Sequence, residues 1–86
     1  MGDKSRESTK RGEQDALREV LKEARIRSGL TAKEVSRRVR AHHSFVSRIE
    51  RGLRTIDLVE FLDLAEAMGA DPREMFASFY ARCKTS

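Results

Sequence analysis

The side chains that could do chemistry in this chain lie close together, in one short segment near its middle. They supply imidazole, hydroxyl and guanidinium groups, and they are His43, Ser44, Ser47, Arg48 and Arg51. On a helix around Ser44 to Arg51 they point outward, because the apolar pair Val46 and Ile49 takes the inward face. Groups of this kind hydrogen-bond to phosphates and to base edges. The segment therefore indicates a nucleic acid ligand.

The distribution of charge points to the same kind of ligand. Between Lys22 and Arg54, ten basic residues stand against three acidic ones, which gives this third of the chain a net charge of +7. Residues 1–21 are neutral and residues 55–86 carry −3. A positive block on an otherwise neutral to acidic chain is expected for a protein with a polyanionic partner.

Other kinds of chemistry find little support. The residues form no Ser/His/Asp arrangement, glycine-rich phosphate loop or pair of carboxylates in an apolar pocket. Cys83 is the only cysteine and is far in sequence from His42 and His43, which argues against a zinc site. We therefore expect no enzyme activity, no metal and no cofactor, and nothing suggests a small-molecule ligand.

Five short helices account for the pattern of apolar residues. Leu17, Val20, Leu21 and Ala24 form one helical face, which ends at Ser28 and Gly29. Thr31 and Glu34 form a capping box for a second helix, which is followed by a break near residues 40–42 and by the third helix. The fourth helix begins after Asp57 and ends at Gly69, and the fifth begins at Asp71-Pro72. No segment resembles a strand, so we predict a compact all-α bundle.

The chain of 86 residues is long enough for one domain with a thin core. We expect residues 1–14, which are polar and of mixed charge, to be a flexible arm, and residues 15–86 to be the folded domain. No apolar stretch reaches the length of a membrane span or a signal-peptide core, so we expect a cytoplasmic protein with no membrane partner.

The second and third predicted helices have the spacing of a helix-turn-helix from about Thr31 to Arg51. Two helices that cross closely need a small residue at the crossing, and Ser36 is that residue. Their inner faces are apolar, with Val35, Val39, Ala41, Val46 and Ile49.

Two stretches, RIRSGLT at residues 25–31 and SFVSRIERG at residues 44–52, resemble the Cro and phage-repressor-like helix-turn-helix family, also called XRE-type. The resemblance covers about Leu17 to Met75. It implies a five-helix, lambda-repressor-like fold and a sequence-specific DNA-binding transcriptional regulator, a repressor, which reads double-stranded DNA in the major groove.

The resemblance also implies roles for particular residues. Base contacts fall to His43, Ser44, Ser47 and Arg48, and phosphate contacts to Ala32, Lys33, Arg51 and Arg54. It further implies that Glu50, a carboxylate in the helix that faces DNA, forms a salt bridge with Arg25.

Three positions depart from the family pattern. Ala32 stands where glutamine is common, so one contact from the second helix is missing. Arg40 stands where glycine is favoured, so the turn carries about 1 kcal/mol of left-handed strain or adopts another shape. His42 stands at the usual N-cap, so we expect Ser44 to cap and shorten the third helix.

The fifth helix, at about residues 71–84, is expected to form a homodimer that reads a palindromic operator. A core this small cannot cover all of its apolar side chains, which are Met75, Phe76, Phe79, Tyr80 and Cys83. The alternative is an antitoxin or adaptor that uses the same scaffold mainly to bind another protein.

Overall fold

The computed structural model describes the backbone of residues 3–85 and the side chains of residues 12–84. Its elements are five helices, with no strand in the described residues: α1 (Asp3–Arg27), α2 (Ala32–Arg38), α3 (Phe45–Glu50), α4 (Leu58–Met68) and α5 (Pro72–Thr85). The predicted all-α, five-helix architecture is confirmed. None of these helices is both long and apolar enough to cross a membrane.

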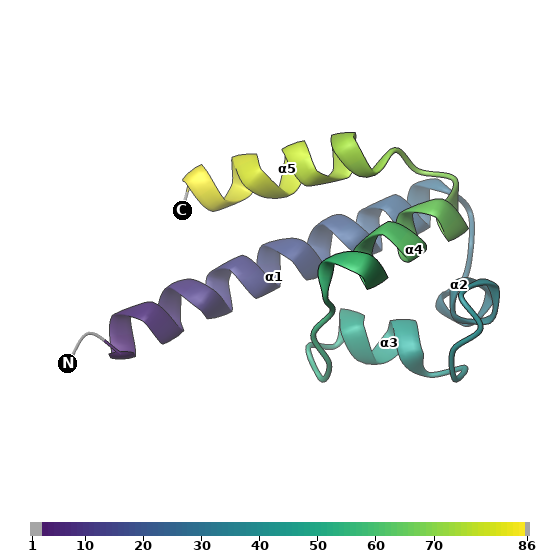
Figure 1. The fold of residues 1–86 in the computed structure, drawn as a ribbon, viewed down its shortest axis with the longest axis horizontal. Helices are drawn as coiled ribbons and strands as arrows, with labels where there is room; N and C mark the ends of the chain where they lie inside the picture. The colour runs from purple at the N-terminus through teal and green to yellow at the C-terminus, as the bar shows by residue number, and fades with distance from the viewer. Residues whose placement is uncertain (1–2, 86) are drawn as a thin grey trace.

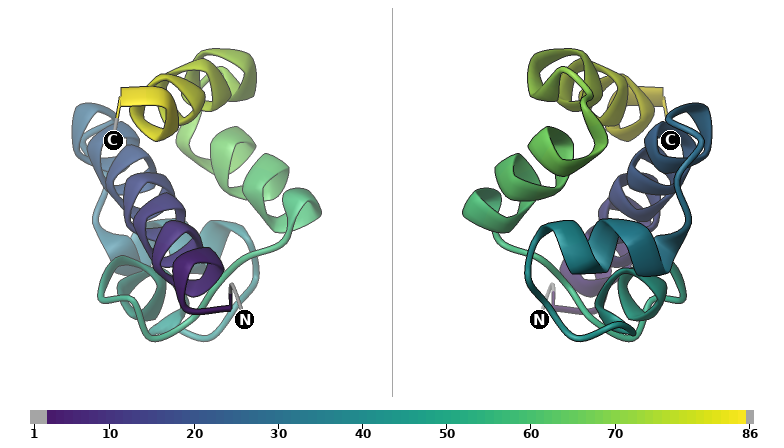
Figure 2. Two further views of the ribbon diagram at one scale, coloured as in Figure 1. Left: turned by 90° about the vertical axis from the view of Figure 1, so that its left-hand side faces the viewer. Right: turned by 90° about the vertical axis from the view of Figure 1, so that its right-hand side faces the viewer.

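The helices enclose a core that every one of them helps to form. α1 and α4 stand between α5 on one side and the α2–α3 pair on the other (Figures 1 and 2), and α5 runs antiparallel to α1. The buried apolar side chains are Val20, Leu21, Ala24, Val35, Val46, Ile49, Phe61, Leu64, Ala65, Met68 and Met75. Burial of these side chains is the main force that holds α2 and α3 against the rest of the domain.

The helix boundaries follow the capping residues in the sequence. In the capping box of α2, the Glu34 amide donates to Thr31 Oγ1 over 3.0 Å and the Thr31 amide donates to Glu34 over 2.8 Å. These bonds favour the ionised carboxylate and hold the pKa of Glu34 below its usual value. Asp57 and Glu60 form a second such box at the start of α4.

The first helix is longer than expected. We expected a flexible arm over residues 1–14, whereas α1 begins at Asp3 and continues without a break to Arg27. Lys, Glu, Gln and Arg are good helix formers, and extending an existing helix costs far less than nucleating one, so a polar stretch can extend a helix without being buried. The flexibility of this stretch remains a prediction.

The apolar residues of α4 and α5 divide between two faces. On α4, Leu58 and Leu62 are 69% and 45% exposed, whereas Phe61 and Leu64 are buried. On α5, Met75 is buried, whereas Phe76 and Tyr80 are 50% and 54% exposed. Arg82 also pairs with Glu19 and Glu23 of α1.

Candidate DNA-binding surface

The helix expected to face DNA is only six residues long. Its inner side chains, Val46 and Ile49, are buried, whereas Arg48 is exposed on the opposite side. Because the Arg48 guanidinium has no hydrogen bond or ion pair within the described residues, it is available to a ligand. Ser47 is half-buried, and its hydroxyl donates to the Ser44 carbonyl over 3.0 Å.

The turn between α2 and α3 takes the strained form. Arg40 has φ of 61° and is the one residue other than glycine with a positive φ in the described part of the chain. This is the left-handed conformation that the sequence predicted for a position where glycine is favoured. Backbone hydrogen bonds from Arg40 to Arg37 and from Ala41 to Ser36 close the turn at 2.9 Å each.

His42 forms hydrogen bonds with Ser44 at the start of α3. Its Nδ1 accepts a hydrogen bond from the Ser44 amide over 3.2 Å and lies 2.8 Å from Ser44 Oγ. Ser44 is the N-cap residue of a short α3, as expected, but its side chain makes no capping hydrogen bond, since the hydroxyl is engaged with His42. His43 stays exposed, with its ring centroid 4.2 Å from that of His42.

At the crossing of α2 and α3, Ser36 forms hydrogen bonds in addition to being small enough for the two helices to approach. Its side chain is fully buried, and its Oγ accepts the Val46 amide over 3.0 Å and donates to the Ala32 carbonyl over 2.9 Å. The amides in the first turn of a helix have no partner within that helix. Ser36 therefore caps α3 from the neighbouring helix, a role that the sequence did not reveal.

The far end of α3 is held by the expected ion pair. Arg25 Nε donates to Glu50 Oε2 over 2.6 Å and Arg25 Nη2 to Oε1 over 2.9 Å, and both side chains are at most 15% exposed. Arg25 Nη1 also donates to the Leu30 carbonyl over 2.9 Å. The hydrogen bonds with Glu50 raise the pKa of Arg25 above its usual value. The negative charge of Glu50 is thereby balanced by Arg25, so it would not repel a phosphate that approaches α3.

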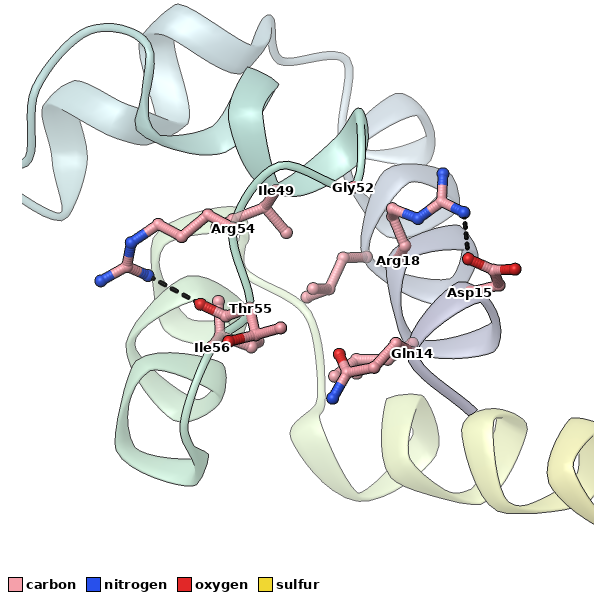
Figure 3. A pocket seen from close by; sticks show the side chains of 10 residues that line it. Gln14, Asp15, Arg18, Ile49, Gly52, Arg54, Thr55 and Ile56 are labelled. Atoms are coloured by element: carbon pink, nitrogen blue, oxygen red, sulfur yellow. Dashed lines mark hydrogen bonds and ion pairs between the residues drawn. The ribbon is translucent and has the colours of Figure 1, made fainter. Parts of the chain in front are cut away.

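Arg18 is a second arginine of α1 at this end of α3. Its Nη1 donates to the Glu50 carbonyl over 3.2 Å, and its Nη2 pairs with Asp15. Arg18 also lines a pocket of about 220 Å³ between α1 and the segment that follows α3 (Figure 3). The spacing of seven residues between Arg18 and Arg25 puts both on one face of α1, which is a signal that could have identified Arg18 from the sequence.

The four residues expected at phosphates differ in availability. Lys33 and Arg51 are exposed and their side chains have no ion pair within the described residues, whereas the Ala32 methyl packs against the core, so that only its backbone can face a phosphate. Arg54 differs most from the expectation, because its guanidinium already binds Glu60 over 2.9 Å.

We predict that Ser36→Ala lowers the free energy of unfolding by about 1–3 kcal/mol, because the buried Val46 amide loses its acceptor. Urea denaturation of the purified protein measures this change. Ser78→Ala, at a half-buried serine of α5, is the matched control and should stay within about 0.5 kcal/mol of the parent. Equal effects of the two substitutions would contradict the capping role of Ser36.

We also predict that Glu50→Ala costs about 2–4 kcal/mol of stability, because it leaves the mostly buried Arg25 without its counterion. Arg25→Met combined with Glu50→Ala should cost less than the sum of the two single changes. A double-mutant cycle in chemical denaturation gives the coupling energy, and strictly additive costs would mean that the pair contributes no stability.

Comparison with known proteins agrees with this geometry. A family model described as a helix-turn-helix domain matches residues 16–78. Among solved structures, an XRE-family like protein from Pseudomonas syringae pv. tomato str. DC3000 is 32% identical, with a TM-score of 0.83 over 90% of this chain and 94% of that one. A search of curated proteins gave no match. The chain thus belongs to the XRE-type helix-turn-helix domain family.

Proposed function

We propose that this protein is a sequence-specific DNA-binding transcriptional regulator that inserts α3 into the major groove and represses by occupying its operator. The observation that carries the proposal is the state of Arg48. It is exposed and unpaired within the described residues, on a helix whose opposite face is buried and whose two ends are hydrogen-bonded to α1 and α2. An arginine on so rigid a support can form the bidentate bond to guanine that is the commonest specific contact in the major groove.

The outward residues divide into two groups in this proposal. Arg48 and His43, both exposed, read base edges, and Ser44 and Ser47 make weaker contacts because their hydroxyls already have partners. Lys33, Arg51 and the backbone at Ala32 hold phosphates. Contacts to phosphate raise affinity for any duplex and carry no sequence information.

Selection of bound sequences from a pool of random duplexes tests the proposal directly. An enriched motif supports a sequence-specific regulator. Failure to retain any duplex at low salt would refute it, because a +7 segment around α3 must at least bind DNA nonspecifically if it faces the phosphates.

We predict that Arg48→Ala lowers affinity for the selected sequence by about 1–3 kcal/mol and leaves affinity for a scrambled duplex nearly unchanged. Arg51→Ala is the matched control, because it removes the same charge from a neighbouring exposed position. It should weaken binding to both duplexes and reduce the slope of log K against log salt by about 0.9 per subunit. Titrations at several salt concentrations separate the two effects, and the reverse pattern would place α3 outside the groove.

We further propose that the protein binds as a homodimer through a surface shared by α4 and α5, and that its operator is palindromic. The apolar side chains available there are Leu58, Val59, Leu62, Phe76 and Tyr80, each at least 45% exposed. Of the five residues expected at the interface, Met75 is 4% exposed and belongs to the core, and Phe79 and Cys83 are half-buried. Two-fold symmetry would set the two α3 helices about 34 Å apart, one turn of DNA.

Phe76→Glu should therefore convert the protein to a monomer, because it places a charge in the middle of an apolar interface. Sedimentation equilibrium at tens of micromolar measures the change. Ile26→Glu is the control, since Ile26 is 59% exposed on α1 and lies outside this surface. A monomeric parent protein would refute the dimer.

The same exposed apolar surface favours a second function, that of an antitoxin or adaptor whose scaffold mainly binds another protein. The two functions predict different binding to DNA. An interaction module of this kind should not bind random duplex DNA at low salt, whereas the proposed regulator should.

A further inference from the structure

Arg54, in the segment between α3 and α4, binds three parts of the chain at once. Its two terminal nitrogens donate to the Glu60 carboxylate of α4 over 2.9 and 3.2 Å, and Nη1 also donates to the Thr55 carbonyl over 3.0 Å. The guanidinium carbon lies 4.6 Å from the ring centroid of Phe45, the first residue of α3. The side chain thus connects the start of α3, the segment that follows it and the first turn of α4.

Two surface pockets border the Arg54 side chain. The pocket of about 220 Å³ against α1 lies on one side, lined by Ile49, Gly52 and Ile56 among others. A second pocket of about 330 Å³ lies between the α2–α3 turn and α4, and Arg54 lines both. Figure 3 shows the Arg54 side chain running away from the first pocket, on the side of the segment opposite Arg18. Between these two open hollows, the contacts of Arg54 join the segment to α3 and α4.

The electrostatics favour the internal partners over a phosphate. The hydrogen bond from Arg54 holds the pKa of Glu60 below its usual range, so this carboxylate is ionised at neutral pH. The Nε–H group of Arg54 has no acceptor within the described residues, but a phosphate bound there would lie beside the Glu60 carboxylate, which would repel it. Lys33 and Arg51 have no such competing partner.

We propose that Arg54 is a positioning residue that fixes the angle of α3, and not the phosphate contact that the family resemblance implies. This inference rests on the proposed DNA-binding function, because it concerns how α3 discriminates between sequences. The planar guanidinium is suited to the task, since one face packs on Phe45 while its edge forms two parallel bonds to Glu60. Release of this clamp by Arg54→Lys leaves the net charge near DNA unchanged and lets the base-reading helix move.

The test uses two substitutions that remove the clamp in different ways. Arg54→Lys keeps the positive charge but loses the bidentate bond and the stacking on Phe45. Glu60→Gln removes the counter-charge but keeps an acceptor for the Asp57 amide, because glutamine also completes a capping box. Each should lower affinity for the selected sequence about fivefold to twentyfold, or about 1–2 kcal/mol, leave a scrambled duplex within about twofold, and keep the salt slope unchanged.

A phosphate contact gives the opposite pattern. Arg54→Lys would then be nearly silent, since lysine also binds phosphate as a point charge, and Glu60→Gln would tighten binding to both duplexes. Arg54→Gln would lower the salt slope by about 0.9 per subunit, as expected for the control Arg51→Gln. Observation of this pattern would overturn the positioning role.

Hydrogen exchange in the absence of DNA supplies a readout that does not depend on the proposed function. Arg54→Lys and Glu60→Gln should each speed exchange of the Arg48 amide, which bonds to the Ser44 carbonyl over 2.9 Å, while α1 amides keep the parental rate. Unchanged exchange in α3 would overturn the clamp even if no duplex were bound. Loss of duplex binding by the parent protein would refute the proposed function and leave this result standing.

Discussion

α3 cannot hold its own shape, and the rest of the structure is arranged around that constraint. A helix of six residues forms too few internal hydrogen bonds to offset the cost of nucleation, so its order comes from outside. The Ser36 hydroxyl accepts an amide at its first turn, and two arginines of α1 hold Glu50 at its last. Val46 and Ile49 anchor its inner face between them. With both ends and one side fixed, only the outer side chains remain free to meet a ligand.

The same arrangement explains why a carboxylate, Glu50, is tolerated on a helix in the most positive part of the chain. Glu50 would repel phosphates if it pointed outward, yet it joins α3 to α1 because it faces a guanidinium that is itself mostly shielded from water. Charge pairs in such surroundings are screened less than those at the surface, so the pair also specifies the direction in which α3 can pack. Lys33, Arg48 and Arg51, by contrast, are exposed and have no ion pair within the described residues.

The sequence was sufficient for features that depend on local chemistry. The capping boxes and the left-handed glycine ends of helices each follow from a few neighbouring residues, and the Arg25–Glu50 pair and the alternatives for Arg40 followed from the family resemblance. Features that depend on the packing of distant elements could not be predicted from the sequence. The acceptor role of Ser36 requires knowledge of which amide lies above it, and the partners of Arg54 require the path of the segment between α3 and α4.

The size of the core limits how many apolar side chains one copy of the chain can cover. α1 provides a single apolar stripe, which is already shared by α3, α4 and α5, so Met75 fills it while Phe76, one residue later, lies half exposed. At the rotation that α5 adopts, the side chains of Met75 and Phe76, about 100° apart around the axis, lie on different sides of the helix. In this rotation Phe76 of α5 and Leu58 of α4 line one pocket. The apolar surface is thus a consequence of how α5 is fixed to α1, and any partner that covers it must contact α4 and α5 together.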